Sequence, residues 1–537
     1  MKRMNYFWKG VMIFIGAIVV GSGLAWIYLS IFDRSTDSDA SSVVTDTVGF
    51  WDADVHVSQV DVEGTAYRSS AKLSVTWMIP SQDVSHFFVV AKDEYSQETM
   101  SETIDASKDE AELTGLKSDT SYEITVLACL DEACETSLES TESVEGSTEA
   151  EYWQIQGTGS SYETAEQVVD HGSTLSYLLP YSDWAPKDLQ GVVKYYFNGS
   201  AASPQAEVGI KVASSQDGYT SFDEITDLFW HECDRNRDPN NPRGNTVDPT
   251  SCPDGQLEMF AFQPIPLASG IIRLFFEASA PRDPDGITQI YSIDSLDGYV
   301  GEDFDQSSTS TICGDADEAA LAPGGDCEPE LLIGSSENGI ESGIVNARQN
   351  KIGYPIQDSW IWDESPGTFM ILTGEDSCGQ TRDGLFYSVF DGEDWNVQEE
   401  DGCAVPLVLD AHGPVIVHMG GDRYKVYYEN YEYASADRSV KNVSSKPTRL
   451  LYANGGDDGM VDLEDWEGEE VAREVHFLWP DGTVLDDQEE SGLGDHMIWL
   501  PQNNLEEQVM YMNLGGFDNK NWIKPSAGLG MSVLVNP

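Results

Sequence analysis

One short motif recurs through the C-terminal part of the chain and restricts the folds that it can adopt. In each copy an apolar strand pattern ends, a turn containing Asp-Gly follows, and an aromatic residue stands a few positions later. The copies lie at 208–222, 288–304, 384–395 and 449–466. Glycine reaches the positive φ values of tight turns, and the aspartate side chain bonds the turn backbone. These segments therefore predict β-hairpins of one recurring kind.

A second strand pattern, rich in aromatic residues, precedes every hairpin. These strands lie at 189–197, 269–278, 367–374 and 421–429, and the segments EEQVMYMNL and AGLGMSVLVNP supply a fifth pair of strands. A four-stranded sheet repeated around an axis buries both of its faces and exposes few edges. We therefore predict a mainly β fold with a five-bladed β-propeller over residues 151–537. A row of unrelated β-sandwiches is the alternative, but sandwiches do not require one recurring hairpin.

The repeat resembles the five-bladed propellers of glycoside hydrolase families 43 and 32, where strand pairs ending in Ser-x-Asp-Gly-x-x-Trp/Phe are common. The resemblance covers about residues 151 to 537 and rests on the repeated hairpins. It implies the fold more strongly than any activity. Residues 151–158 precede the first blade, and we expect them to add the strand that closes the ring against the last blade.

Residues 52–148 have a different pattern of short alternating strands. Leu116, Thr120 and Tyr122 have the spacing of a tyrosine corner, in which the phenol bonds to upstream backbone. With Trp77 as a buried aromatic, the segment resembles a fibronectin type III domain. That family implies a β-sandwich that acts as a spacer or a binding module. The predicted strands are 72–79, 86–91, 111–116 and 121–128.

The N-terminal segment predicts how the chain meets a membrane. Residues 1–10 carry three basic side chains, 11–32 are apolar and uncharged, and 33–51 read as an acidic stalk. About 20 apolar residues span a bilayer as a helix, and basic residues mark the cytoplasmic side. We therefore expect a single-pass anchor with an extracytoplasmic C-terminus. A cleaved signal peptide, with a shorter apolar region of roughly 7 to 15 residues, is the alternative and would give a secreted protein.

The eight cysteines fall into four pairs that are close in sequence. An even number of cysteines in an exported segment indicates disulfides, and pairing in sequence order is the simplest connectivity. Zinc is the competing interpretation, but it requires Cys-x-x-Cys spacing or interleaved histidines. The predicted pairs are Cys129 with Cys134, Cys233 with Cys252, Cys313 with Cys327, and Cys378 with Cys403.

In a propeller the innermost strands begin at the axis, so residues at their starts converge on one pocket. We expected those strands to begin within 182–188, 255–262, 357–362, 410–417 and 494–500. Inverting glycoside hydrolysis requires two carboxyl groups roughly 6.5 to 9.5 Å apart. The catalytic candidates are Asp183, Asp358 and Asp410, and the binding candidates are His412, Asp495 and His496. Tryptophans beside them offer stacking platforms for sugar rings, namely Trp184, Trp360, Trp362 and Trp499.

The candidate acids depart from the families that the repeat resembles. Those families take Asp from blades one and two and Glu from blade three, whereas blade three here offers Asp358 and blade two offers Glu258. No arginine accompanies them, which also argues against a sialidase, because a sialidase binds its substrate's carboxylate with arginines. The DAH and GDH segments at 410–412 and 494–496 are predicted to place histidines at equivalent positions of adjacent blades.

The loop between Cys233 and Cys252 alternates oxygen-bearing side chains in the manner of a calcium loop. It lacks the glycine and glutamate of an EF-hand, so calcium binding and a polar loop pinned by a disulfide both remain open. The candidate calcium ligands are Asp234, Asn236, Asp238 and Asn240. The sequence has no P-loop, dinucleotide, GxSxG or HExxH motif, so it predicts no nucleotide or redox cofactor.

The charge excludes further partners. The chain has 29 basic and 94 acidic residues, giving a net charge of −65, which repels nucleic acids and anionic lipid surfaces. An exterior rich in salt would screen this repulsion. We therefore predict a membrane-anchored extracytoplasmic protein whose propeller binds carbohydrate or another surface ligand, with the type III domain as a spacer. An active glycoside hydrolase and a structural or adhesive envelope protein are the alternatives.

Overall fold

The computed structural model describes the two segments expected to form domains, with gaps between elements. The described residues are 46–95, 98–155, 175–179, 193–200, 208–215, 224–230, 235–236, 246–247, 258–267, 272–279, 288–295, 330–334, 344–353, 362–376, 378, 384–420, 423–430, 432–433, 443–445, 447–455, 460–478, 481–484, 493–499, 509–514 and 528–537. No helix within these residues is long and apolar enough to cross a membrane. The predicted anchor at 11–32 lies outside them.

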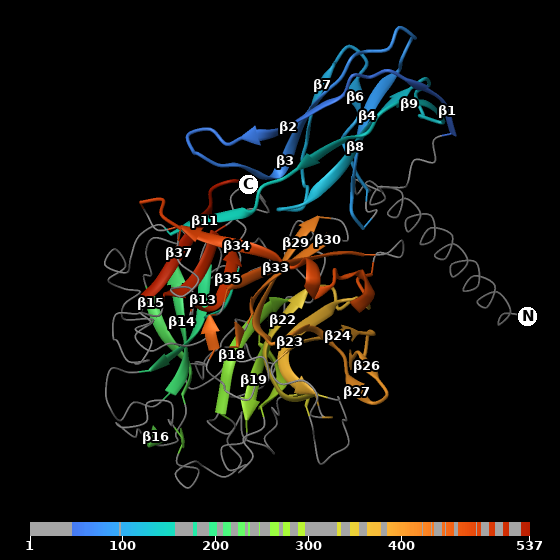
Figure 1. Cartoon of the computed structure of the whole chain (residues 1–537). Coiled ribbons are helices and arrows are strands. Elements are labelled where there is room, and N and C mark those ends of the chain that lie inside the picture. Colours follow the sequence, from blue (N-terminus) through green and yellow to red (C-terminus); the bar gives the residue numbers. More distant parts are fainter. Residues whose placement is uncertain are drawn as a thin grey trace, which may run out of the picture.

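The N-terminal part is a β-sandwich of two packed sheets (Figure 1). One sheet contains β2 (His56–Asp61), β3 (Arg68–Thr76) and β7 (Glu110–Leu113). The other contains β1 (Asp46–Trp51), β9 (Thr136–Ser140), β8 (Ser121–Cys129), β4 (His86–Asp93) and β5 (Glu98–Met100), with β10 (Val144–Ser147) on β8 and β6 (Ile104–Asp105) on β4. Alternating residues of these strands face one core that includes Trp51, Trp77 and Phe87.

The predicted tyrosine corner is present and closes this core near β8. The Lys117 backbone N–H donates a hydrogen bond to the Tyr122 hydroxyl at 2.7 Å, and Leu116 and Tyr122 are both buried. Burial raises the pKa of Tyr122, so the phenol stays protonated. Ser118 takes the place of the proline often found in such corners, and the corner forms without it.

The strands of the C-terminal part form five antiparallel units, the blades, within the described residues; blades one, two and three are separate sheets, and blades four and five are joined in one eight-stranded sheet. Blade one is β12 (Leu175–Leu179), β13 (Val193–Ser200), β14 (Val208–Ser215) and β15 (Glu224–Trp230). Blade two is β18 (Glu258–Pro266), β19 (Ile272–Ser279), β20 (Thr288–Ser295) and β21 (Glu330–Ile333). Blade three is β22 (Ile344–Gly353), β23 (Phe369–Asp376), β24 (Gly384–Phe390) and β25 (Trp395–Val397), and β28 (Pro406–Leu409) also pairs with β24.

Blade four is β29 (Ala411–Gly420), β30 (Arg423–Asn430), β33 (Thr448–Asn454) and β34 (Arg473–Leu478). Blade five is β35 (Leu493–Trp499), β36 (Val509–Leu514) and β37 (Gly528–Leu534), completed by β11 (Glu151–Ile155). The smaller elements are β16 (Arg235–Asn236), β17 (Thr246–Val247), β26 (Glu399–Glu400), β27 (Cys403–Ala404), β31 (Glu432–Tyr433), β32 (Val443–Ser445) and the short helices η2 (Leu463–Asp465) and η3 (Glu469–Val471).

The five blades form a closed ring around an axis. Their first strands contact one another in the order β12, β18, β22, β29 and β35, and β35 contacts β12 again. β11 closes the ring because it pairs antiparallel with β37 and parallel with β34 of blade four. The predicted five-bladed propeller is therefore confirmed, as is the expectation that a strand within 151–158 closes it.

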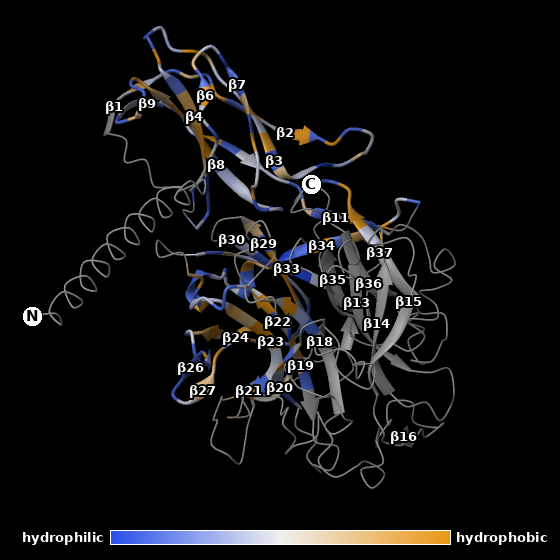
Figure 2. Ribbon diagram, turned by 180° about the vertical axis from the view of Figure 1, so that it is seen from behind, coloured by the Kyte–Doolittle hydropathy of each residue, from blue (hydrophilic) through white to orange (hydrophobic). Residues whose placement is uncertain are grey.

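The two repeated strand patterns form the second and third strands of each blade, and the Asp-Gly turn follows the third strand. In blade three this turn joins β24 to β25 as a tight hairpin. In blades two and four the fourth strand begins only at Glu330 and Arg473, so the predicted tight hairpins are wrong there. β13 with β14, β19 with β20, β23 with β24, β30 with β33, and β36 with β37 all pair antiparallel. Aromatic side chains from these strands fill the gaps between blades, as Phe369 of blade three does against Tyr424 of blade four. Figure 2 shows this concentration of hydrophobic residues along β22, β23 and β24. The recurring pattern therefore encodes the packing between blades.

Two of the predicted disulfides lie within the described residues, and both are formed. Cys129 is bonded to Cys134, and Cys378 is bonded to Cys403. The predicted Cys233–Cys252 and Cys313–Cys327 pairs lie outside the described residues.

Candidate functional site

The five first strands all begin at one end of the propeller, which we call the axial face. Because each second strand runs antiparallel to its first strand, the ends of the second strands lie at the same face. In blade four, for example, Ala411 at the start of β29 pairs with Asn430 at the end of β30. The axial face is therefore the end of the propeller at which all five first strands begin and all five second strands end.

Every first strand departs from regular pairing shortly after it begins. The irregularities lie between Ser176 and Leu178, Phe260 and Gln263, Val345 and Arg348, His412 and Val415, and Gly494 and Met497. A β-bulge redirects side chains, and bulges are over-represented at the rims of barrels and beside active sites. The same distortion in all five blades distinguishes the axial face from the opposite face.

The register reveals three equivalent glutamates that the sequence analysis missed. The residue just before the irregularity pairs with Glu277 in blade two, Glu375 in blade three and Glu429 in blade four. In blade five the equivalent residue is Asn513. A signal was present in the sequence, because each glutamate stands at or just after the end of an aromatic strand pattern. The equivalence of the three glutamates depends on the strand register, which the sequence alone does not provide.

Each of these glutamates shares a strand face with side chains that contact the following blade. Glu277 lies on the face of Phe275, whose ring packs near Trp362 of blade three. Glu375 lies on the face of Thr373, whose hydroxyl oxygen accepts a hydrogen bond from the Gly413 backbone N–H of blade four at 3.2 Å.

Glu429 has the same placement in blade four. It shares a face with Tyr427, which bonds Glu151 of β11 in blade five. Side chains alternate between the two faces of a strand, so the three glutamates have equivalent directions. The three glutamates therefore occupy equivalent positions on three successive blades at the axial face.

Glu429 forms the best-defined polar contact at this face. Its Oε2 atom lies 3.0 Å from Nε2 of His412, and both side chains are buried. A carboxylate at one imidazole nitrogen fixes the orientation and tautomer of the ring. The pair is suited to hold hydroxyl groups or to move a proton.

Asp410 precedes this pair in a strained backbone conformation. Its φ is +52°, in the left-handed region that non-glycine residues seldom adopt, and its side chain is buried. Gly413 also has positive φ, at +63°, inside the irregular part of β29. Strain of this kind persists where surrounding structure enforces it, and it is concentrated at functional sites. The start of β29 is therefore the clearest candidate site among the described residues.

The structure places some of the predicted site residues and leaves others undescribed. Asp410 and His412 lie at the axial face, as predicted. Asp495, His496 and Trp499 lie on β35, but their side chains are outside the described set. Asp183, Trp184, Asp358 and Trp360 lie outside the described residues, so their roles stay predictions.

Three expectations about the axial face were wrong. β12 ends at Leu179 and β22 ends at Gly353, so the segments 182–188 and 357–362 follow the first strands and do not begin them. The register also pairs His412 with Glu429 and Gly494 with Asn513, which makes His412 equivalent to Gly494 and not to His496. Trp362, which was expected to stack on sugar, is buried and donates its indole N–H to Thr368 at 2.8 Å.

The predicted calcium loop is not tested. Asp234, Asp238 and Asn240 lie outside the described residues, and Asn236 lies on β16 without a described side chain. Among the described residues, His86, Cys129 and Cys134 have potential metal-ligating atoms within 4.8 Å of one another. The two sulfur atoms are joined in a disulfide, so they are not thiolate ligands.

One family model matches part of the chain. The fibronectin type III family model matches residues 57–142. These residues form a fibronectin type III domain. No curated protein gives a match to the chain.

Among solved structures, the chain is similar to a thermostable family-43 glycoside hydrolase at 12% identity, covering 68% of this chain and 89% of that one with a TM-score of 0.33. It is similar to an endo-arabinase from Bacteroides thetaiotaomicron at 9% identity, covering 68% and 95% with a TM-score of 0.34. It is also similar to Bacillus subtilis levansucrase at 10% identity, covering 70% and 88% with a TM-score of 0.38. The propeller assignment rests on the strand pairing of this chain, because these scores are low.

Proposed function

We propose that this protein is an extracytoplasmic carbohydrate-binding protein, anchored by residues 11–32, whose propeller binds its ligand at the axial face. The observation that carries the proposal is the set of equivalent glutamates on blades two, three and four, together with the His412–Glu429 pair beside strained Asp410. Carboxylates and imidazoles bond the hydroxyl groups of a sugar through acceptors and donors of fixed direction. The glycoside hydrolases and the levansucrase to which the chain is similar act as supporting analogies only.

The charge of the chain narrows the class of carbohydrate. A ligand must approach a protein with a net charge of −65, so neutral or amino-substituted sugars meet less repulsion than uronic acids or sulfated sugars. This argument extends the exclusion of nucleic acids and anionic surfaces to anionic polysaccharides.

Glycoside hydrolysis is a second candidate, favoured by carboxylates that face successive blades. Hydrolysis needs one protonated acid and one carboxylate on opposite sides of the glycosidic bond. Glu375 and Glu429 come from adjacent blades, and Asp410 lies between their strands in the chain. Binding is the first proposal because it needs only the hydrogen-bonding groups at this face, whereas hydrolysis also needs two carboxyl groups at a fixed separation.

A glycan array with the full chain in detergent tests the proposal. We expect binding to neutral or amino sugars, lost in Glu429→Gln and retained in Glu474→Gln, which alters an exposed glutamate on β34. Near-UV circular dichroism checks that both variants keep the native packing. Release of reducing sugar from a bound glycan would identify hydrolysis. Binding that Glu429→Gln leaves unchanged, or a folded protein that binds no glycan, would contradict the proposal.

A further inference from the structure

The type III domain contacts the propeller at the end opposite the axial face. Arg423 at the start of β30 donates a hydrogen bond from Nη1 to the Gly115 carbonyl at 3.1 Å. Arg423 pairs with Asn454, at the far end of the hairpin from the Glu429–Thr448 pair. β37 ends beside the start of β36, and Asn536 follows it at this same end. Figure 1 shows the sandwich seated there, beside β11 and the β29–β30 hairpin.

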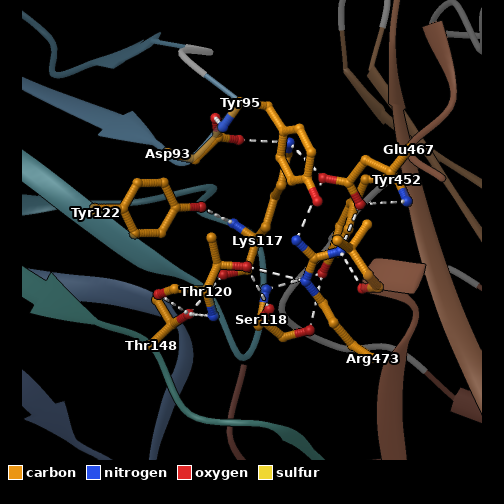
Figure 3. Close-up of polar contacts among 11 residues, drawn as sticks. Asp93, Tyr95, Lys117, Ser118, Thr120, Tyr122, Thr148, Tyr452, Glu467 and Arg473 are labelled. Atoms are coloured by element: carbon orange, nitrogen blue, oxygen red, sulfur yellow. Dashed lines mark hydrogen bonds and ion pairs between the residues drawn. The ribbon is translucent and has the colours of Figure 1, made fainter. Parts of the chain in front are cut away.

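A buried ionic network crosses the contact (Figure 3). The Lys117 ammonium lies 2.7 Å from Oδ2 of Asp93 in its own domain and 2.8 Å from Oε1 of Glu467 in the propeller. The Arg473 guanidinium bonds both oxygens of Glu467. Two cations therefore match two carboxylates, and all four side chains are at most 10% exposed.

The Arg473 guanidinium is stabilised in its charged form within this network. Burial lowers the pKa of this guanidinium, but hydrogen bonds and the charge of Glu467 outweigh burial and leave the pKa above its ordinary value. Removing one member of a buried pair costs about 3 to 5 kcal/mol, because it leaves an uncompensated charge. Separating the domains would expose the network to water, but it would also break its hydrogen bonds.

Further hydrogen bonds between the domains surround the ionic pairs. The Tyr452 hydroxyl accepts the Ser118 backbone N–H at 3.0 Å, and Arg473 Nε donates to Thr120 Oγ1 at 2.9 Å. The tyrosine-corner loop, residues 115–120, is therefore used twice. It stabilises the sandwich through Tyr122, and its outer surface binds the propeller.

The linker between the domains is short and is held by hydrogen bonds. β10 ends at Ser147 and β11 begins at Glu151, and the backbone between them is bonded to the sandwich at Thr148 and Glu149. Asn536 fastens the other side: its Nδ2 donates to the Ala150 carbonyl at 2.7 Å, and its Oδ1 accepts from the Tyr152 N–H at 2.9 Å. The strand that closes the propeller ring is thus continuous with the docked domain.

The N-terminal entry to the sandwich lies at the end away from the propeller. Asp46 at the start of β1 pairs with Thr136, which follows the Cys129–Cys134 loop. The docking residues of the sandwich, including Ser70 and Thr120, lie at the other end of β3 and β8. A nine-residue strand such as β8 spans about 30 Å, and an eight-residue blade strand adds about 26 Å.

We infer that the type III domain is a rigid mount that holds the propeller with its axial face turned away from the N-terminal segment. The mount works through an interface of matched buried charges, so the domain is not a flexible spacer. Its geometry rests on described contacts, whereas its consequence rests on the proposed anchor and the proposed ligand site. The strand lengths put the axial face about 50 Å from Asp46, the first described residue after the proposed anchor. The partner of the axial face is then a glycan polymer of the surrounding medium or of a facing surface.

Double electron–electron resonance tests the rigidity. Spin labels on Glu102→Cys in the sandwich and Glu393→Cys in blade three, both exposed, report the distance between the domains in the full chain. We expect one narrow distance peak that broadens or splits in Lys117→Glu. Lys92→Glu, which reverses an exposed cation on β4 beside Glu98, should leave the peak narrow. The milder Glu467→Gln keeps the test valid if Lys117→Glu fails to fold.

Energy transfer to labelled lipid tests the orientation. Val484 is exposed and follows the end of β34 at the axial face. In nanodiscs containing the full chain, a donor dye on Val484→Cys should transfer several-fold less energy to the lipid than a dye on Glu102→Cys. A broad wild-type distance distribution, a peak that neither Lys117→Glu nor Glu467→Gln alters, or equal transfer from both dyes would overturn the inference. Failure of the glycan array alone would refute the ligand site and leave the mount standing, and failure to enter nanodiscs would refute the anchor.

Discussion

Replacing Glu151 with glutamine should open the propeller ring at its closing strand. The Glu151 carboxylate accepts hydrogen bonds from Lys425 Nζ at 3.0 Å and Trp153 Nε1 at 3.1 Å, and it also accepts one from the Tyr427 hydroxyl. Both charged side chains of the pair are about 4% exposed, so water hardly screens them. These contacts hold β11 against blade four. Because β11 precedes blade one in the chain, this contact closes the ring.

The magnitude follows from burial. Glutamine keeps one acceptor but loses the charge that offsets the Lys425 ammonium, and breaking a buried pair costs about 3 to 5 kcal/mol. For an m-value of about 2 to 3 kcal/mol/M in urea, the unfolding midpoint should fall by about 1 to 2.5 M. Glu474→Gln on the neighbouring strand is the matched control, because its partner Arg449 and Glu474 itself are more exposed and such pairs contribute about 0 to 1 kcal/mol.

Urea unfolding followed by tryptophan fluorescence and by far-UV circular dichroism measures both variants. Coincident transitions by the two probes are needed before midpoints are compared. A midpoint for Glu151→Gln within about 0.3 M of the control would show that burial does not strengthen this closure, and the reasoning would be refuted.

Four other predictions follow from the described residues. Burial raises the pKa of Tyr122, Tyr387 and Tyr452, so the stability they contribute should be complete below pH 10 and lost as pH rises above it; absorbance at 295 nm should show these phenols ionising only as the fold is lost, not before. Asp410→Gly should relieve the positive φ and leave stability equal or up to about 1 kcal/mol higher, while glycan binding falls; a lower melting temperature would contradict this. Breaking Cys378–Cys403, with a separation of 25 residues, should cost about 3.5 kcal/mol, against about 2 kcal/mol for Cys129–Cys134, with a separation of 5; equal costs in urea would contradict the loop-entropy argument. Molar salt should raise the melting temperature of the full chain by screening its net charge of −65, and an unchanged or lower value would show that surface repulsion is not destabilising.

The sequence predicts the features that depend on local patterns. The second and third strands of each blade carry apolar and aromatic patterns within short segments, and they form where these patterns indicate. The Asp-Gly turn makes a tight hairpin to the fourth strand in blade three, but not in blades two and four. The tyrosine corner depends on Tyr122 and a hydrogen bond only five residues away. In both cases the residues that make the structure are close in sequence, so one chain suffices to recognise them.

The first strands could not be placed in the same way. β12 has five residues and precedes β13 by a long connection, whereas the prediction assumed that each first strand ran directly into the second. This assumption holds for blade four, where β29 ends at Gly420 and β30 begins at Arg423. The equivalent glutamates were missed for a related reason, because their equivalence is defined by pairing across strands.

The domain contact had no local signal at all. Lys117 and Glu467 are 350 residues apart, and each is one charged residue among many in a chain rich in acids. A spacer was therefore the natural expectation for the type III domain. The Lys117–Glu467 contact forms because the fold brings the tyrosine-corner loop to the start of β34.

Several of the basic residues lie at contacts between the domains and between the blades, where they bind acidic side chains. Lys117 and Arg473 lie between the domains, Lys425 lies at the ring closure, and Arg273 lies between blades two and three, where it bonds Asp294 and Glu364. Each joins elements that are distant in sequence, at places where dissociation would otherwise leave carboxylates facing one another. The exposed acids repel one another and are screened by salt, whereas these buried pairs are screened much less. Salt should therefore relieve the repulsion without dissolving the contacts that fix the axial face in its orientation.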